Sequence, residues 1–352
     1  MPLVKGIVDR FREHQLNIFG PTAQAAKLEG SKAFSKNLMQ KYNIPTAEFR
    51  SFTDADHAKR YVEDKGPVVV KADGLAAGKG VILCQDAKEA RAAIQKIMKD
   101  KAFGEAGGRV VIEEWLIGKE ISLLAFTDGK TVLSLEGAED HKAAYDGDTG
   151  PNTGGMGAFS PSSVFTQALR DQVQKEIMIP TVQAMEQEGA SYQGVLYAGL
   201  MITKDGPKVL EFNARMGDPE TQPIMMRLKS DLAQLCLAAL DKKLDVTTAE
   251  WDERAALGVV LAAGGYPENY AKGLAISGLD NCDTSDCKTF QAGTALNGDD
   301  VVTAGGRVLC VTALGDSVTQ AQSLAYESIK KISWDGMFYR TDIGYRAIAR
   351  ES

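Results

Sequence analysis

The sequence predicts an α/β (α+β) protein with more than one domain. Short runs rich in Val, Ile and Leu, such as Val110 to Leu116, alternate with longer segments of helical periodicity, such as Phe165 to Glu188. A chain of 352 residues is long enough for two or three domains of ordinary size. Polar and glycine-rich segments separate these runs, so we expect compact α/β units joined by loops.

The composition excludes several functional classes. The chain carries 40 basic and 47 acidic residues, a net charge of −7, and no basic block offsets this balance. It therefore does not fit a nucleic-acid binder or a protein of acidic membrane surfaces. No apolar run approaches the roughly 20 residues that span a bilayer, and charged residues interrupt the first segment too early for a signal peptide. The five cysteines show no metal or redox spacing, so we expect a reduced, cytoplasmic setting.

The first 22 residues resemble the end of a larger α/β unit. Leu3 to His14 has the spacing of an amphipathic helix, and Leu16 to Phe19 reads as a short buried strand that Gly20-Pro21 stops. One helix and one strand cannot form a core by themselves. We therefore expect the remnant of a domain whose earlier part is absent.

Residues 47–113 predict a small α/β subdomain. Its expected strands are 47–52, 67–71, 81–84 and 109–113, and its helices are 54–65 and 86–101. We then expect strands 121–126 and 131–135, a long helix 165–188, a hairpin of strands 194–203 and 208–213, and a core helix 230–240. After residue 251, the strands 257–263 and 305–313 and the helix 317–332 predict another α/β unit.

Lys71 and Lys79 mark a candidate phosphate site. Lys71 ends a β-branched strand, and the loop of small residues from Asp73 to Gly80 could close its backbone N–H groups over phosphates. The spacing is one residue too short for a P-loop, which we reject. Lys32 lies in the first turn of a helix that Ser31 can cap, where a cation is unfavourable unless an anion is close. A plain hairpin turn and a solvated lysine are the alternatives.

The run from Val110 to Leu116 reads as an apolar strand that ends in two acids. The backbone of such a hinge could bind the edge of an adenine, and Glu120 could reach a ribose. A strand with a charged end explains the same residues equally well.

The strand end around residue 211 is a candidate metal site. Glu211 and Asn213 are two residues apart, so both side chains lie on one face of a strand. A carboxylate and an amide oxygen suit Mg²⁺ held between protein and phosphates. Arg215 follows on that face and could bind a carboxylate or phosphate through two parallel hydrogen bonds. Asp218 or Thr221 could cap the next helix, and an ordinary strand end with a salt bridge is the alternative.

Residues 139–161 form a polar, glycine-rich stretch without helical or strand periodicity. A loop of this length inside a compact domain is usually functional or disordered. Gly154 to Gly157 allow backbone N–H groups to approach an anion closely. His141 could act as a general base, although a hydrogen-bonding role suits a histidine in a charged loop better. The polar side chains available to small ligands are Asp140, His141, Lys142, Asp148, Asn152 and Thr153.

Seven stretches together give the chain a family resemblance that covers nearly all of it. They are GPTAQAAKLEGSKAF, VVVKADGLAAGKGV, VVIEEWL, EDHKAAYDGDTGPNTGGMGAFSP, VLEFNARMGDPETQP, LGVVLAAGGYP and AGGRVLCVTALG. In this order they resemble the ATP-grasp ligases, and within them the phosphoribosylamine–glycine ligase family. The resemblance implies an ATP-grasp domain at 23–250 with a small flexible lid at about 47–113, and a C-terminal α/β domain at 251–352. Residues 1–22 would be the remnant of an N-terminal Rossmann-like domain.

The resemblance also implies an activity. ATP would phosphorylate glycine, and 5-phosphoribosylamine would attack the glycyl phosphate to give glycinamide ribonucleotide, ADP and phosphate in purine biosynthesis. ATP and Mg²⁺ or Mn²⁺ are the expected cofactors, and small molecules are the expected partners, with no nucleic acid and no membrane. A monomer is expected when the N-terminal domain is present. The alternatives are an ATP-binding remnant without ligase activity and a related carboxylate–amine ligase.

The expected site residues fall into four groups. The nucleotide-binding residues are Lys32, Lys71, Gly78, Lys79, Gly80, Glu113, Glu114, Leu116 and Glu120, and the metal ligands are Glu211 and Asn213. The substrate-binding residues are Asn152, Thr153, Gly154, Gly155, Met156, Asp218, Pro219 and Glu220, and the catalytic residues are Lys142, Asp148 and Arg215. The strand 194–202 carries no acid, so one magnesium ion would rest mainly on phosphates and water.

Overall fold

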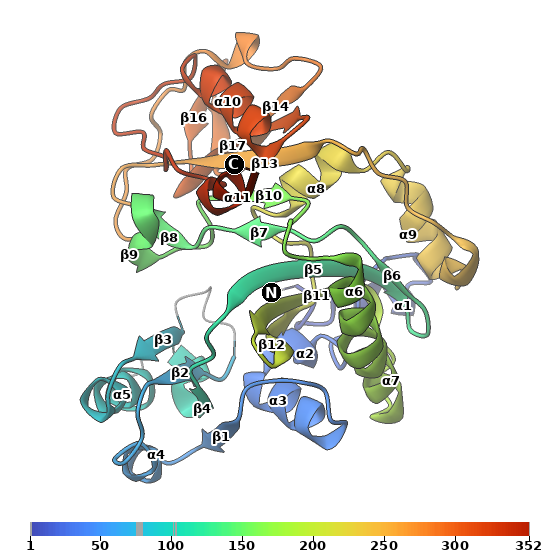
Figure 1. The fold of residues 1–352 in the computed structure, drawn as a ribbon, viewed down its shortest axis with the longest axis vertical. Helices are drawn as coiled ribbons and strands as arrows, with labels where there is room; N and C mark the ends of the chain where they lie inside the picture. The colour runs from blue at the N-terminus through green and yellow to red at the C-terminus, as the bar shows by residue number, and fades with distance from the viewer. Residues whose placement is uncertain (1, 75–79, 101, 103, 352) are drawn as a thin grey trace. The chain divides into compact units, whose positions relative to one another are not determined.

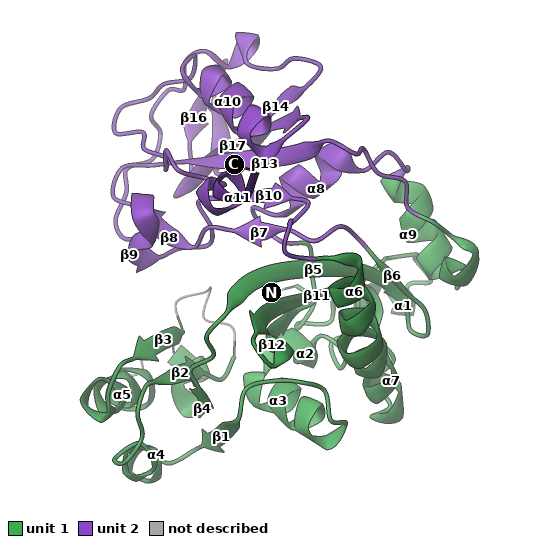
Figure 2. Ribbon diagram, in the orientation of Figure 1, with its two compact units in different colours: residues 1–134, 166–216, 232–248 green, residues 135–165, 217–231, 249–352 purple. Residues whose placement is uncertain are grey.

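A computed structural model describes residues 2–74, 80–100, 102 and 104–351. The chain forms two compact units (Figure 2). Unit 1 comprises residues 1–134, 166–216 and 232–248, and unit 2 comprises residues 135–165, 217–231 and 249–352. The chain passes between the units several times, so this division differs from the domain boundaries expected at residues 22 and 250. In the described part of the chain, no helix combines the length and apolar character that a membrane crossing requires.

Unit 1 contains a four-stranded antiparallel sheet with the strand order β12-β11-β5-β6 (Figure 1). Its strands are β5 (Lys119–Asp128), β6 (Val132–Ser134), β11 (Gln193–Thr203) and β12 (Gly206–Asn213). The predicted hairpin is confirmed, because β11 pairs with β12 so that Gly199 faces Glu211 and Tyr197 faces Asn213. The predicted metal ligands therefore lie on a strand at the end of this sheet.

The predicted helices of unit 1 are present, but the predicted burial of one of them is not. The long predicted helix is present as α6 (Gln167–Val173), a π-helical segment η4 (Gln174–Met178) and α7 (Ile179–Gln187). The predicted core helix is α9 (Leu232–Leu240), which a short 3-10 turn, η5 (Leu244–Val246), follows. This core assignment is wrong, because α9 buries Leu235 and Ala239 while Leu232 is 42% and Leu237 46% exposed.

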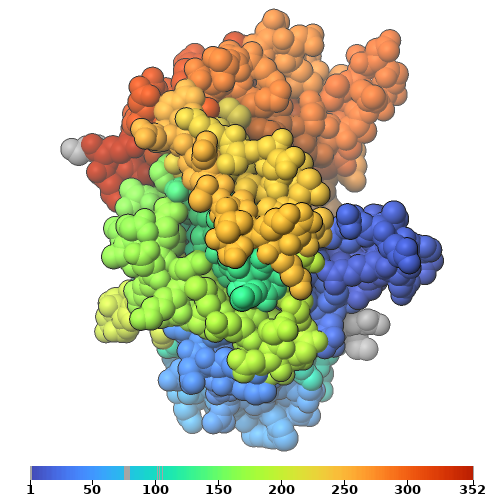
Figure 3. Space-filling view, turned by 90° about the vertical axis from the view of Figure 1, so that its right-hand side faces the viewer, coloured from blue at the N-terminus to red at the C-terminus, as the bar shows by residue number. Residues whose placement is uncertain are grey.

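The N-terminal segment belongs to unit 1 and lies at the surface (Figure 3). It contains the helices α1 (Ile7–Glu13), α2 (Lys27–Gly30) and α3 (Lys32–Lys41). The predicted cap of α3 is confirmed, since the Ser31 side chain accepts a hydrogen bond from the Phe34 N–H at 3.1 Å. The strand expected at residues 16–19 is wrong. These four residues pair with no neighbouring strand in the described structure, and Leu16 is 55% exposed, so nothing holds them in a ladder.

The expected small subdomain is also part of unit 1. Its strands are β1 (Phe49–Phe52), β2 (Val68–Ala72), β3 (Val81–Cys84) and β4 (Val110–Glu114), in the antiparallel order β1-β4-β2-β3. Its helical segments are α4 (Ala55–Tyr61), α5 (Ala87–Ile94), η1 (Gln95–Lys99) and η2 (Gly104–Gly108). Small and β-branched residues from β2, β4, α4 and α5 form a separate apolar core. This separate core is consistent with the compact α/β subdomain predicted at residues 47–113.

Unit 2 is built on a five-stranded antiparallel sheet with the order β14-β17-β13-β10-β7. These strands are β7 (Glu139–Asp140), β10 (Gly157–Ser160), β13 (Ala255–Ala262), β14 (Cys287–Gln291) and β17 (Arg307–Gly315). A separate hairpin joins β15 (Thr294–Asn297) to β16 (Asp300–Thr303). The helical segments are α8 (Thr221–Arg227), η6 (Leu279–Asn281), α10 (Val318–Ile329) and α11 (Tyr345–Glu351).

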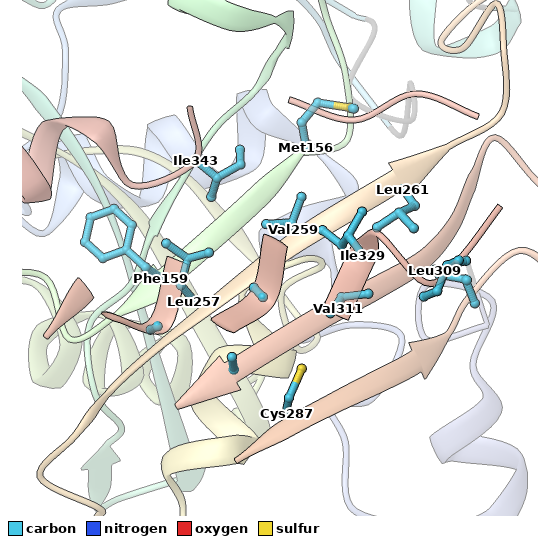
Figure 4. Close-up of a cluster of buried hydrophobic side chains, with 14 of the residues drawn as sticks. Met156, Phe159, Leu257, Val259, Leu261, Cys287, Leu309, Val311, Ile329 and Ile343 are labelled. Atoms are coloured by element: carbon cyan, nitrogen blue, oxygen red, sulfur yellow. The ribbon is translucent and has the colours of Figure 1, made fainter. Parts of the chain in front are cut away.

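The core of unit 2 lies between this sheet and α10 (Figure 4). Leu257 and Val259 of β13, Val311 of β17 and Ile329 of α10 are at most 1% exposed within it. Alternating residues of β13 and β17 meet in register, with Val259 opposite Val311. The expected strands and helix of this region are therefore confirmed.

The long polar stretch of residues 139–161 is more ordered than its sequence predicts. Besides β7 and β10 it holds β8 (Ala143–Tyr145), a 3-10 turn η3 (Asp146–Asp148) and β9 (Thr149–Asn152), with β8 and β9 paired. The absence of strand periodicity was misleading for Gly157–Ser160, because β10 lies inside the sheet and all four of its residues are buried. A strand buried on both faces has no polar alternation to detect.

Candidate active site

A buried cluster of three charges lies in unit 1. The Nζ atoms of Lys36 on α3 and Lys71 on β2 lie 2.8 and 3.0 Å from the same carboxylate oxygen, Oε2 of Glu113 on β4. The three residues are 2%, 5% and 2% exposed. Lys71 also donates to the Leu210 carbonyl at 3.0 Å, and Lys36 donates to the Thr46 hydroxyl at 2.7 Å. One carboxylate oxygen is thus shared by two buried ammonium groups, and the Glu211 carboxylate also lies close enough to act on Lys36.

The second carboxylate oxygen of this cluster is unsatisfied. Glu113 Oε1 is buried and has no hydrogen-bond partner among the described residues. A buried carboxylate oxygen without a donor costs free energy, so this atom is suited to accept a hydrogen bond from a ligand. A small apolar cluster in the same unit joins Ala47, Leu116 and Met201 with the partly buried Leu210. An acceptor and an apolar surface are what a purine base requires.

The two other acidic residues expected to bind nucleotide have different surroundings. Glu114 Oε1 accepts hydrogen bonds from the Glu48 N–H at 3.0 Å and from Lys208 Nζ at 2.9 Å. Glu120 lies near the start of β5 and is exposed. Glu114 is thus engaged by protein groups, whereas Glu120 is accessible to solvent.

The loop after Lys71 is anchored to the start of α3. Asp73 Oδ1 accepts hydrogen bonds from the Ser31 hydroxyl at 3.0 Å and the Ala33 N–H at 3.1 Å. This carboxylate is the anion that the first turn of α3 needs. Lys32 Nζ donates to the Gly74 carbonyl at 3.2 Å, and the Gly80 carbonyl accepts from the Ala72 N–H at 2.8 Å. The predicted nucleotide ligands Gly78 and Lys79 lie outside the described residues.

The end of β12 presents the predicted metal ligands and the predicted arginine. Glu211 and Asn213 are partly buried and the intervening Phe212 is buried, as expected for alternate faces of a strand. No three His, Cys, Asp or Glu side chains converge as a metal site within the described ranges. Because one carboxylate and one amide oxygen cannot complete six positions, a hard divalent ion held here would need phosphate and water oxygens. The residues fit an ion that arrives with a nucleotide.

Arg215 does not share the face of β12, because the strand ends at Asn213. Its Nη1 donates to the Met216 carbonyl at 2.9 Å, and its Nε lies 3.6 Å from Glu29 Oε1. Glu29 also accepts the Ala214 N–H at 2.8 Å, so this carboxylate fixes the turn that follows the strand. The Arg215 side chain is 53% exposed and can meet a ligand.

The glycine-rich loop of unit 2 does not present free N–H groups to an anion. The Thr153 N–H donates to the Lys142 carbonyl and the Met156 N–H to the His141 carbonyl, both at 2.7 Å. The Gly154 N–H donates to the Tyr266 hydroxyl at 3.1 Å, and the Gly155 N–H donates to the Thr153 hydroxyl at 3.0 Å. In the loop as folded, these four N–H groups therefore have partners within the protein. Met156 is also fully buried in the unit 2 core, so we assign it a packing role instead of the expected substrate contact.

Arg307, at the start of β17, holds two predicted substrate segments together. Its Nη1 donates to the Gly154 carbonyl at 2.9 Å and to the Asp218 carbonyl at 2.7 Å, and its Nη2 lies 2.8 Å from Asp218 Oδ2. Both segments belong to unit 2. Neither Asp218 nor Thr221 caps α8 with its side chain; the residue before the helix is Glu220, which makes no side-chain cap. Pro219 and Glu220 are buried.

Asp148 lies at the centre of a second charge cluster in unit 2. It accepts from Arg340 Nη1 at 2.9 Å, from the Tyr345 hydroxyl at 2.6 Å and from Arg346 Nη2. Burial alone would raise the pKa of Asp148, but the hydrogen bonds from Tyr345 and Arg340 outweigh it and lower the pKa to about 2. Arg340 is 1% exposed and also binds Asp342. The predicted catalytic residue Asp148 thus ties its loop to the C-terminal segment.

The other predicted polar residues of this loop differ in exposure. Lys142 and Asn152 are exposed, and Lys142 Nζ lies 3.9 Å from Asp140 Oδ1. His141 is 3% exposed, and its Nε2 accepts the Gly344 N–H at 3.2 Å. Burial is the main reason that the pKa of His141 is lowered to about 4. The structure therefore favours a hydrogen-bonding role for His141 over that of a general base.

Family models identify the class of enzyme. Residues 30–221 match the model described as phosphoribosylglycinamide synthetase, ATP-grasp (A) domain, and residues 256–346 match the C domain of the same synthetase. A biotin carboxylase domain from Hydrogenobacter thermophilus shares the fold, with a TM-score of 0.74 at 17% identity over 94% of this chain and 72% of that one. The fold and these family models define an ATP-grasp enzyme, a carbon–nitrogen ligase that uses ATP.

Closer relatives identify the family. The chain is 59% identical to a phosphoribosylamine–glycine ligase of Vibrio vulnificus over 100% of this chain and 82% of the relative, and 57% identical to that of Pseudomonas aeruginosa over 99% and 82%. A crystal structure of the Thermotoga maritima phosphoribosylamine–glycine ligase matches with a TM-score of 0.87 at 35% identity, covering 96% of this chain and 84% of that one. The chain belongs to the phosphoribosylamine–glycine ligase family.

Several residues that organise the site gave no signal in the sequence. Lys36, Thr46, Glu29, Arg307 and Arg340 are ordinary charged or polar residues of helices, strands and loops, and each finds its partner far along the chain. The apolar surroundings of Lys36 on α3 were a weak signal, since a lysine among buried positions requires a partner.

Proposed function

We propose that this protein joins glycine to 5-phosphoribosylamine to form glycinamide ribonucleotide in purine biosynthesis. The glycine carboxylate attacks the terminal phosphorus of ATP, releasing ADP and forming glycyl phosphate. The amine then attacks the acyl carbon, phosphate leaves, and the nitrogen loses a proton. The observation that carries the proposal is the buried lysine pair around Glu113 in a chain 59% identical to a phosphoribosylamine–glycine ligase.

The nucleotide side of the reaction is assigned to unit 1. Lys71 and Lys32 neutralise phosphate oxygens, and positioning with electrostatic stabilisation is the main demand of phosphoryl transfer. The adenine contacts Leu116 and its apolar neighbours, and Glu113 Oε1 accepts a hydrogen bond from the amino group of the base. Glu211 and Asn213 would hold Mg²⁺ or Mn²⁺, which supplies charge neutralisation on the phosphates when bound. These assignments use the unsatisfied acceptor and the strand-end oxygens.

The substrate side is assigned to exposed groups. The Arg215 guanidinium, which is 53% exposed, binds the carboxylate of glycine. In unit 2, Lys142 and Asn152 are exposed polar side chains of the glycine-rich stretch, and we assign them to substrate binding. Arg307 fixes Gly154 and Asp218, so these residues shape the substrate loop through their backbone.

Further features of the protein complete this proposal. We assign residues 23–250 to the ATP-grasp domain with a lid at about 47–113, and residues 251–352 to the C-terminal domain. The five cysteines are unpaired, which supports a cytoplasmic location. The partners are small molecules.

The test is release of ADP from Mg-ATP with glycine and freshly generated 5-phosphoribosylamine, omitting each component in turn. The proposal expects ADP only when both substrates are present. A matched variant, Glu211→Gln, keeps the size of the side chain and removes a negative charge at the metal. It should lower turnover at least about 100-fold, while Glu250→Gln, outside the site, should leave it unchanged. Nucleotide binding without substrate-dependent ADP would instead identify an ATP-binding protein that is not a ligase.

A further inference from the structure

Lys36 is a buried cation that none of the predicted roles uses. It lies on the inner face of α3, is 2% exposed, and has two close partners, Glu113 Oε2 at 2.8 Å and Thr46 Oγ1 at 2.7 Å. Thr46 in turn donates to the Val209 carbonyl at 2.7 Å. Burial lowers the pKa of Lys36 to about 8, with Glu113 opposing and Lys71 adding to the change, so the ammonium form still predominates at pH 7. Moving a charged group from water into the protein interior costs free energy, so a buried lysine is expected to have a role.

The geometry around Glu113 suggests that role. The Oε2 atom of Glu113 is shared between Lys36 and Lys71 at nearly equal distances of 2.8 and 3.0 Å. An ammonium group has three hydrogens, and Lys71 gives one to Glu113 and one to the Leu210 carbonyl at 3.0 Å. One hydrogen of Lys71 therefore stays available for an anion. Whether Lys71 also offers a positive charge depends on what else neutralises Glu113.

We propose that Lys36 is a positioning residue that neutralises Glu113 and so keeps the charge of Lys71 available for the nucleotide phosphates. The inference rests on the proposed function, in which Lys71 binds those phosphates. Lys36 and Lys71 share Glu113, and the Glu211 carboxylate also lies close enough to act on Lys36. Without Lys36, Lys71 is left as the one ammonium group beside these carboxylates, and the phosphates meet a site with one positive charge fewer. Lys36 itself does not touch the nucleotide.

The first experiment compares MgADP and adenosine as probes of the full chain. In Lys36→Met the affinity for MgADP should fall on the order of 10- to 100-fold, because one charge is lost a few ångströms from the phosphates. The affinity for adenosine, which has no phosphate, should change by less than about twofold. Calorimetric titration measures both. Lys41→Met is the matched control, because Lys41 lies on the same helix, is 63% exposed and pairs with Glu188 instead.

A double variant separates charge compensation from a structural role. In Lys36→Met/Glu113→Gln the carboxylate that Lys36 neutralises is gone, so Lys71 regains its charge and MgADP affinity should recover most of its loss. If Lys36→Met alone does not fold, the double variant can be compared with Glu113→Gln instead. On the Glu113→Gln background, where two ammonium groups remain, adding Lys36→Met should bring MgADP affinity back to about the wild-type value and not below it.

Each outcome decides the inference. Equal losses for MgADP and adenosine in Lys36→Met, wild-type affinity in Lys36→Met, or no recovery in the double variant would overturn it. Failure of the proposed ligase reaction is seen separately, as tight MgADP binding by the unmodified chain without substrate-dependent ADP release. Absence of MgADP binding by the unmodified chain would overturn both.

Discussion

Because His141 is buried, we predict that the free energy of unfolding depends on pH. It is 3% exposed, and its Nε2 accepts the Gly344 N–H at 3.2 Å, a bond that requires the neutral ring. Burial first, and then the nearby Arg340, lower the pKa of His141 from 6.5 to about 4. Between pH 6.5 and about 4, His141 is therefore protonated in the unfolded chain and neutral in the folded chain.

The sign and size of the effect follow from proton linkage. Above about pH 6.5 the ring is neutral in both states, so His141 contributes no pH dependence to the free energy of unfolding in that range. As the pH falls toward 4, the unfolded state gains a proton and the free energy of unfolding decreases. A pKa difference of about 2.5 units corresponds to a loss of about 3 kcal/mol, since each unit is worth about 1.36 kcal/mol.

The assay is urea unfolding at several pH values between 7.5 and about 4.5, at constant ionic strength. Trp251 and Trp334 report on unit 2 by fluorescence once Trp115 of unit 1 is replaced by Phe. The comparison variant is His141→Gln, whose amide oxygen can accept the Gly344 N–H and does not titrate. The stability of the histidine protein should fall relative to His141→Gln as the pH is lowered, whereas His57→Gln, at an exposed position of unit 1, should show no such difference. A constant difference between the two proteins over this range would refute the reasoning.

Three further predictions concern named contacts. Gly155→Ala should destabilise unit 2 by about 2–3 kcal/mol in urea unfolding, because Gly155 has a φ of +116° and a Cβ would lie 2.3 Å from Pro219; unchanged stability would contradict the loop geometry. Arg340→Met should cost about 1–3 kcal/mol, because it removes the buried partner of Asp148 while Tyr345 and Arg346 still bind that carboxylate, and a loss below about 1 kcal/mol would show that the pair contributes little. Arg215→Ala should raise the KM for glycine about 10- to 100-fold with the KM for ATP unchanged in steady-state kinetics; equal effects on both would argue against a glycine contact.

Much of the local structure could be predicted because it depends on short-range patterns. The Ser31 cap needs only a hydroxyl before a helix, and the hairpin of β11 and β12 needs only two β-branched runs around a turn. The nearby pair Glu211 and Asn213 shares a face for the same local reason. Leu16 to Phe19 failed as a strand because a four-residue apolar run becomes a strand only when another strand pairs with it.

The charges that meet inside the protein could not be predicted in this way. Lys36 and Glu113 are neighbours because α3 packs near β4, and nothing local to either residue shows it. The same holds for Arg307, which binds both Gly154 and Asp218, and for the Gly154 N–H, whose partner is the distant Tyr266 hydroxyl.

The α/β class, the order of most elements and the family can be predicted from the sequence, since periodicity, turn residues and motif order are local properties of the chain. The tertiary structure was needed to show that Lys36 pairs with Glu113, that Arg307 binds both Gly154 and Asp218, and that Met156 is buried in the core. The physical reason is that a buried charge or amide is stable only beside a partner, and packing of distant segments supplies that partner.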